Sequence, residues 1–181
     1  GIIVGAVSQT GVGLVLADLV ELLSMGNLLL MLVLVAVLAG VAVWYLQVYG
    51  FYEDVDEITG ASQMMVTLPD GATRPVTVGE FKAIDAESSP IRWRACFTLD
   101  PAEVADAAPF PAATPLNGPN WFQCYSAKAL TADLEAGNAR AILGQSEVRP
   151  DVDRVLIVYP DGRAFAWHQI NDKTPARGVM D

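Results

Sequence analysis

The most conspicuous absence in this 181-residue sequence is positive charge, because none of its 11 Lys and Arg residues lies before Arg74. From residue 53 onward these 11 bases are accompanied by 19 of the 21 acids, all but Asp18 and Glu21, which gives that part of the chain a net charge of −8. Binding to a nucleic-acid backbone or to anionic lipid depends on clustered cations. We therefore expect no nucleic-acid partner. The positive-inside rule also gives no orientation, since the apolar segment lacks flanking cations.

Signatures of catalysis are also missing. The sequence contains no Walker loop, no dinucleotide-binding glycine pattern and no zinc-ligand spacing. His168 is the only histidine, so any Ser-His-Asp or Cys-His arrangement has to use it, and no nucleophile elbow accompanies it. A lone histidine beside Trp167 on a strand is more often structural than catalytic. We predict a protein that is not an enzyme and that holds no cofactor and no metal.

Cysteine is scarce, with only Cys96 and Cys124 in the chain. Outside the cytosol, two cysteines this far apart are most simply paired in one structural disulfide. The alternatives are two buried free thiols, as in a cytosolic protein, or a redox or copper site. The last is disfavoured because no Cys-x-x-Cys motif is present.

The longest uncharged apolar run extends from Leu28 to Leu46. Its 19 residues match the thickness of a bilayer's hydrocarbon core, and Trp44, Tyr45 and Tyr49 lie at its end, where aromatic rings favour the headgroup level. A buried helix of a soluble core is the alternative, but the length of the run favours a span. No small-x-small cleavage site follows, so residues 25–50 are predicted to form an uncleaved transmembrane anchor.

The anchor has unusual neighbours in the sequence. Residues 1–24 are apolar but interrupted by Ser8, Gln9 and several glycines. They are predicted to be a second hydrophobic segment, an interfacial amphipathic helix, or a leader upstream of the true start, which we place at Met25. Residues 51–61 carry four acids and are predicted to be a solvated juxtamembrane linker.

Residues 62–171 have the pattern of a small, mainly antiparallel β domain. Pro69-Asp70-Gly71 and Pro160-Asp161-Gly162 are turn sequences. One helix is clear, Ser126–Ala136, with a capping serine and Gly137 as its stop. The fold class is therefore α+β with one N-terminal transmembrane helix, and residues 172–181 are a loose polar tail. Strands are expected at 64–68, 74–78, 91–99, 154–159 and 163–169.

Arg92 and Arg94 are the strongest candidates for ligand binding. Two arginines two positions apart on a strand share one face and can clamp a carboxylate or phosphate. Surface or partly buried pairing with Asp85 and Glu87 is the plainer interpretation. With Trp167 and His168, these arginines form our candidate contact set for a ligand or partner.

Four stretches resemble a family of single-pass membrane proteins from alphaproteobacteria of the Rhodobacter type. They are YLQVYGFYEDV, SSPIRWRACF, PNWFQCYSAKAL and DRVLIVYPDGRAFAWHQIN, and the match covers about residues 25–171. The resemblance implies a start near Met25, an uncleaved inner-membrane anchor and a C-terminal domain in the periplasm. The family's two cysteines match Cys96 and Cys124, and its Trp-His-Gln-Ile-Asn motif matches Trp167–Asn171. It implies no activity.

These observations lead to two functional hypotheses. The first is a membrane-anchored periplasmic accessory or interaction protein, whose partner is another envelope or respiratory-chain protein. The alternative is a periplasmic ligand-binding module or enzyme that uses His168 with Arg92 and Arg94. A variant of the alternative is a metal-handling protein that uses Cys96, Cys124 and His168. Both alternatives require their residues to converge.

Overall fold

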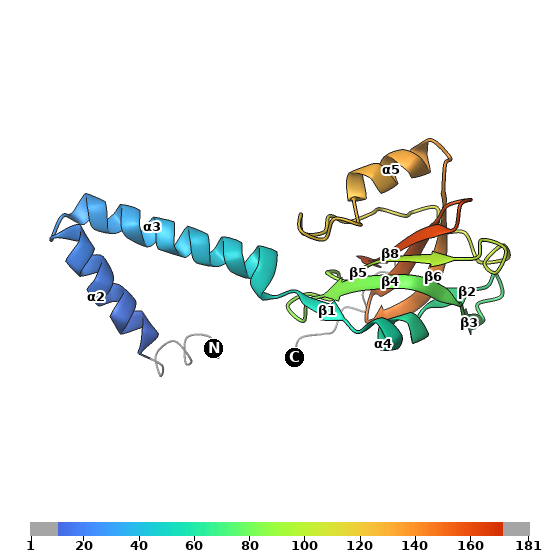
Figure 1. Cartoon of the computed structure of the whole chain (residues 1–181), viewed down its shortest axis with the longest axis horizontal. Coiled ribbons are helices and arrows are strands. Elements are labelled where there is room, and N and C mark those ends of the chain that lie inside the picture. Colours follow the sequence, from blue (N-terminus) through green and yellow to red (C-terminus); the bar gives the residue numbers. More distant parts are fainter. Residues whose placement is uncertain (1–10, 172–181) are drawn as a thin grey trace, which may run out of the picture. The chain divides into compact units, whose positions relative to one another are not determined.

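The computed structural model of the chain describes residues 11–171 (Figure 1). The chain divides into a helical unit that ends at Gly50 and a β domain that begins at Phe51. Residues 1–10 of the predicted leader and the predicted tail, 172–181, lie outside the described residues. Within the described residues the fold class is α+β with one long apolar N-terminal helix, as predicted.

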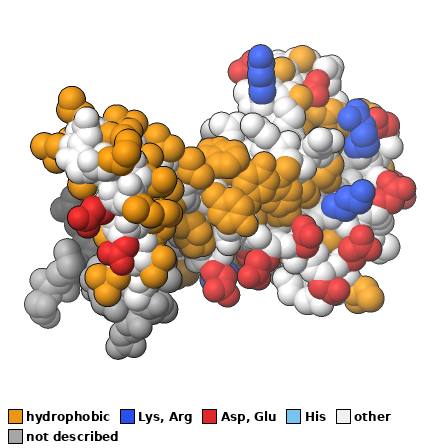
Figure 2. All heavy atoms as spheres, turned by 60° about the vertical axis from the view of Figure 1, so that its left-hand side comes forward, with side chains coloured by type: hydrophobic (Ala, Val, Ile, Leu, Met, Phe, Trp, Pro, Cys, Tyr) orange, Lys and Arg blue, Asp and Glu red, His pale blue; other side chains and the backbone are white. Residues whose placement is uncertain are grey.

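The helical unit contains α2 (Val12–Ser24), α3 (Leu28–Tyr45) and the π-helical turn η1 (Leu46–Gly50). Asn27 starts α3, because its side chain accepts a hydrogen bond from the Leu30 amide at 3.1 Å. Leu28–Gly50 is long and apolar enough to cross a membrane, and none of its residues is buried within the protein. On the face shown in Figure 2, the side chains of this unit are mostly hydrophobic, with few acidic ones.

The β domain is built on a six-stranded antiparallel sheet with the order β1-β4-β5-β8-β7-β6. A separate hairpin pairs β2 with β3. Helix α5 (Ala127–Glu135) follows the N-cap residue Ser126, whose side chain accepts from the Ala129 amide, as its sequence predicts. The strands are β1 (Glu53–Val55), β2 (Met65–Thr67), β3 (Thr73–Pro75), β4 (Val78–Asp85), β5 (Arg94–Leu99), β6 (Arg140–Arg149), β7 (Val152–Val158) and β8 (Arg163–Ile170).

Both predicted turns join antiparallel strands. Gly71 and Gly162 have φ of 85° and 88°, a left-handed conformation that glycine adopts without strain. In each turn the preceding aspartate accepts a backbone amide two residues on: Asp70 from Ala72 at 2.9 Å and Asp161 from Arg163 at 3.1 Å. These bonds stabilise the turns that connect β2 to β3 and β7 to β8.

The sheet is covered on both faces, with α5 on one side and α4 (Glu57–Ser62) on the other (Figure 1). The alternation within β8 assigns its side chains to two cores. Ala164 and Ala166 pack with Trp93 and Phe97 in one core, whereas Trp167 packs in the other core, with Leu130 of α5. Burial on both faces explains why all seven residues of β7 are buried.

Residues 51–61 are not a linker. Glu53–Val55 pairs with β4, and Val55 packs on the core while Glu53 and Asp54 point to solvent. The carboxylate of Asp56 then caps α4 by accepting from the Thr59 amide at 2.9 Å. Glu53 and Asp54 are therefore exposed side chains of an edge strand, Asp56 is a helix cap and Glu57 lies in the first turn of α4. Composition alone does not distinguish these roles from a solvated spacer.

Several strand predictions also differ from the structure, and the strand expected at 74–78 is the shorter β3, Thr73–Pro75. β5 begins at Arg94 rather than at Ile91. The whole of β4 was missed, because its pairing with β5 is interrupted by a bulge between Gly79 and Lys82 and Glu80 there has φ of 49°. A bulge breaks the strict alternation by which strands are recognised in a sequence.

Candidate functional site

The candidate residues lie around three neighbouring strands. In the sheet register Arg154 of β7 is opposite His168 of β8, and Trp167 of β8 is opposite Arg94 of β5. Trp93 comes directly before β5, and its carbonyl accepts the backbone amide of His168 at 3.4 Å. The antiparallel order β5-β8-β7 thus brings together residues that lie 75 positions apart.

His168 is part of a buried stack. Its ring lies 4.8 Å from the Trp93 ring, centroid to centroid, with 17° between the planes. Nδ1 is 3.0 Å from the Pro90 carbonyl and Nε2 is 3.1 Å from Nε of Arg154. Since a carbonyl only accepts and a guanidinium only donates, the ring carries its proton on Nδ1 and accepts with Nε2. Both ring nitrogens are therefore engaged within the protein.

Burial and the positive charge of Arg154 lower the pKa of His168 from 6.5 to about 3. The imidazole is therefore neutral at any physiological pH. To act as a general base it has to give up the bond from Arg154, and to bind a metal through Nδ1 it has to give up the bond to Pro90.

Arg154 completes this stack, and the sequence analysis did not single it out. Its guanidinium lies over the Trp93 ring, with 4.3 Å from Cζ to the ring centroid, and it donates to the Gln63 carbonyl at 3.0 Å. Burial lowers its pKa to about 10, so it stays protonated. One signal was available in the sequence: Arg154 directly precedes the apolar run of residues 155–158 within the same strand.

Arg94 holds a loop in place. Its guanidinium donates to four backbone carbonyls, at 2.7 to 2.9 Å, those of Ile91, Trp93, Leu116 and Asn117. Burial lowers the pKa of this arginine. Because four donors are used by the backbone, Arg94 fastens the proline-rich segment around residue 116 to the start of β5.

Arg92 and Trp167, the other two predicted contact residues, lie outside the stack of His168, Trp93 and Arg154. Arg92 lies before β5, with its guanidinium 5.5 Å from the centroid of the Tyr52 ring. Trp167 is fully buried in the core on the α5 side and donates from Nε1 to Gln169 at 3.0 Å. His168, one residue on, stacks with Trp93 of the opposite core. The predicted contact set is therefore divided between two faces of the sheet.

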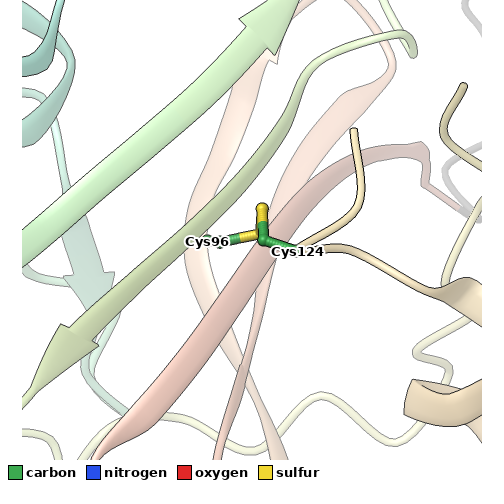
Figure 3. The surroundings of a disulfide bond; sticks show 2 residues. All are labelled: Cys96 and Cys124. Atoms are coloured by element: carbon green, nitrogen blue, oxygen red, sulfur yellow. A yellow bond between two sulfur atoms is a disulfide. The ribbon is translucent and has the colours of Figure 1, made fainter. Parts of the chain in front are cut away.

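Cys96 and Cys124 form a disulfide, as the sequence predicts (Figure 3). The bond joins buried Cys96 of β5 to the exposed Cys124 of the segment that leads into α5, and their Cα atoms are 6.3 Å apart. Both sulfur atoms are thereby removed from the proposed copper or metal site. Among residues 11–171, no three His, Cys, Asp or Glu side chains are grouped as metal ligands.

Comparison with known families matches residues 63–177 to a family of unknown function (DUF6446). The match extends over more than half of the chain. The protein belongs to this family. No curated protein and no solved structure matches the chain.

The boundaries of the DUF6446 match separate two parts of the chain. It includes the disulfide, the buried stack and the Arg94-bound loop. It leaves out Leu28–Gly50, β1 and the whole of α4. The family model therefore describes the body of the β domain without its edge strand and without the apolar helix.

Proposed function

We propose that this member of the DUF6446 family is a membrane-anchored accessory protein, whose β domain lies in the periplasm and acts by contact with another protein of the envelope. One observation carries the proposal. The single histidine has both ring nitrogens engaged, by Arg154 and by the Pro90 carbonyl, in the interior of the domain. The histidine is therefore placed to stabilise the fold rather than to carry out catalysis.

The anchor and the compartment have separate support. Leu28–Gly50 has the length and composition of a membrane span, and it immediately precedes the β domain. The disulfide favours an oxidising compartment, because cytosolic thiols are kept reduced. The sequence resemblance to proteins of Rhodobacter-type alphaproteobacteria points to the inner membrane, with the domain on its periplasmic side.

The charge of the domain limits the kind of partner. The excess of acids over bases beyond residue 53 disfavours nucleic acid and favours a partner with a neutral or basic surface. Envelope proteins, including the respiratory complexes of such bacteria, are the natural class. A ligand site built on Arg92, Arg94 and His168 has less support, since Arg94 and His168 are bonded to the fold itself.

Site-specific photo-crosslinking in cells tests this proposal. A photoreactive phenylalanine is introduced into the full-length chain at one exposed position per variant: Asp70 in the β2–β3 turn, Lys128 on α5 and Asp161 in the β7–β8 turn. An accessory protein is expected to give a discrete adduct with one other protein from one or two of these sides and none from the rest, because a specific interface covers a limited area.

The matched control is the same set of variants carrying His168→Gln. We expect the adducts to persist with little change, because Gln can both donate to Pro90 and accept from Arg154. Loss of every adduct in a His168→Gln protein that keeps its thermal stability contradicts the structural role of this residue. Absence of protein adducts from all three positions contradicts the accessory function.

A further inference from the structure

The β domain carries a group of partly exposed aromatic side chains that contact one another at its surface. Tyr52 lies edge-on to Trp121, with 5.9 Å between ring centroids and 83° between planes, and Trp121 lies 6.3 Å from Phe122 at 74°. All three are half-buried. We call Tyr52, Trp121 and Phe122 the aromatic cluster.

Two segments present this cluster, and both are tied to the sheet. Tyr52 directly precedes β1, which pairs with β4. Trp121 and Phe122 lie just before Cys124, which the disulfide fastens to β5. The cluster is therefore held on the domain rather than on a free loop. Beside it is a hollow of about 480 Å³, whose lining includes Asp54, Glu57, Lys82, Trp121 and Phe122.

Chain connectivity brings the cluster close to the end of the apolar helix. Tyr52 is the second residue after Gly50, where the candidate span ends. An extended residue covers at most about 3.5 Å, so the Tyr52 backbone lies within about 7 Å of that end, whatever the relative orientation of the two units. Phe51 between them is also an exposed aromatic residue.

We propose that the aromatic cluster docks into the headgroup region of the membrane that holds Leu28–Gly50, an inference that rests on the membrane anchoring proposed above. Tyr and Trp rings favour this region because they combine an apolar body with a polar tip. The charges beside the cluster balance: Asp54 and Glu57 share the hollow with Lys82, and the Arg92 guanidinium lies over the Tyr52 ring. A surface with both signs of charge and no net excess fits zwitterionic headgroups.

Fluorine NMR on the full-length chain tests this docking. The protein is labelled with 5-fluorotryptophan and inserted into phosphatidylethanolamine–phosphatidylcholine nanodiscs, with and without lipid that carries a nitroxide near the headgroup. The chain has four tryptophans, Trp44, Trp93, Trp121 and Trp167, whose signals are assigned from single Trp→Phe variants. Trp44 lies within the candidate span, whereas Trp93 and Trp167 are 5% and 0% exposed and serve as buried controls.

We expect the nitroxide to broaden the Trp44 and Trp121 signals several-fold more than those of Trp93 and Trp167. A Tyr52→Ser/Phe122→Ser variant is expected to lose most of the Trp121 broadening while the Trp93 and Trp167 shifts stay in place, which shows that it is folded. Broadening of Trp44 without Trp121 overturns the docking and leaves the anchor intact. Absence of Trp44 broadening overturns the anchor, and the docking with it.

Discussion

At the scale of single residues, the chemistry of His168 follows from its surroundings. An exposed histidine titrates near neutral pH, but this ring stacks on Trp93 beside the guanidinium of Arg154, and burial and that charge both disfavour its protonated form. The same contacts position Arg154, which has a buried charge and no carboxylate at ion-pair distance within residues 11–171. The two residues stabilise each other only while the histidine is neutral.

This arrangement predicts a pH-dependent stability. The pKa of His168 is about 3 in the folded state and 6.5 without the fold, so protons bind preferentially to the unfolded chain between these values. The contribution is complete above pH 6.5 and is lost as the pH falls, by up to about 1.4 kcal/mol per pH unit. Urea unfolding of the full chain in micelles between pH 6.5 and 4.5 measures it.

His168→Gln is the control for this titration, because it keeps a donor and an acceptor and removes the titrating group. We expect its unfolding free energy to be nearly constant across the same pH range. A wild-type protein whose stability is equally flat contradicts the neutral, buried histidine.

Two tyrosines, Tyr125 and Tyr159, have similar packing but different hydrogen bonding. Tyr125 and Tyr159 both pack edge-on against Phe165. The Tyr159 hydroxyl donates to Asp133 at 2.7 Å, whereas the buried Tyr125 hydroxyl has no hydrogen-bond partner among the described residues. Burying an unpaired hydroxyl is unfavourable. Tyr125→Phe is therefore expected to leave stability unchanged or raise it by about 1 kcal/mol, and Tyr159→Phe is expected to lower the melting temperature. The reverse order in thermal scans contradicts this assignment.

At the scale of elements, the sequence predicted what local chemistry determines. The two Pro-Asp-Gly turns, the capped helix α5 and the alternation within β8 all agree with the structure. The edge strand β1 and the bulged strand β4 were missed because they depend on their pairing partner. The Arg94 contacts could not be predicted from the sequence either, because their carbonyl acceptors at Leu116 and Asn117 lie more than twenty residues away along the chain.

The packing of α4 depends on the absence of a side chain at Gly60. A Cβ atom at this position overlaps the Phe81 ring and lies 2.9 Å from Cγ1 of Val55. Gly60→Ala is therefore expected to destabilise the domain by about 1–3 kcal/mol, because the core has to shift to admit the methyl group. Gly118→Ala is the control, since a Cβ there makes only ordinary contacts, 3.6 Å from Tyr125. Equal melting temperatures of the two variants contradict this packing.

The disulfide connects β5 to the segment that precedes α5, across a sequence separation of 28 residues. In the chain-entropy model, closing a loop of this length stabilises the folded state by about 3–4 kcal/mol. The Cys96→Ser/Cys124→Ser variant is expected to lose stability of this order, measured by urea unfolding in micelles. The single variant Cys124→Ser also removes the disulfide, so its unfolding free energy is expected to fall by a similar amount. An unchanged unfolding free energy in the double variant contradicts a structural role of the bond.

At the scale of the whole molecule, the account joins two independent features. The apolar helix Leu28–Gly50 favours a membrane, and the disulfide favours a compartment in which thiols are oxidised. Together they predict a β domain on the outer side of the membrane that anchors it. A buried histidine and a loop-binding arginine are consistent with a domain whose role is contact rather than chemistry.

The redox state of the two cysteines in the cell is the measurement that tests this account most directly. Cells are quenched in acid, free thiols are alkylated, and membranes are washed in carbonate before reduction, a second alkylation with a heavier reagent and mass spectrometry. The account predicts that the protein stays in the membrane fraction and that Cys96 and Cys124 carry only the second label. Recovery of both cysteines with the first label contradicts an oxidising compartment and, with it, the proposed location of the domain.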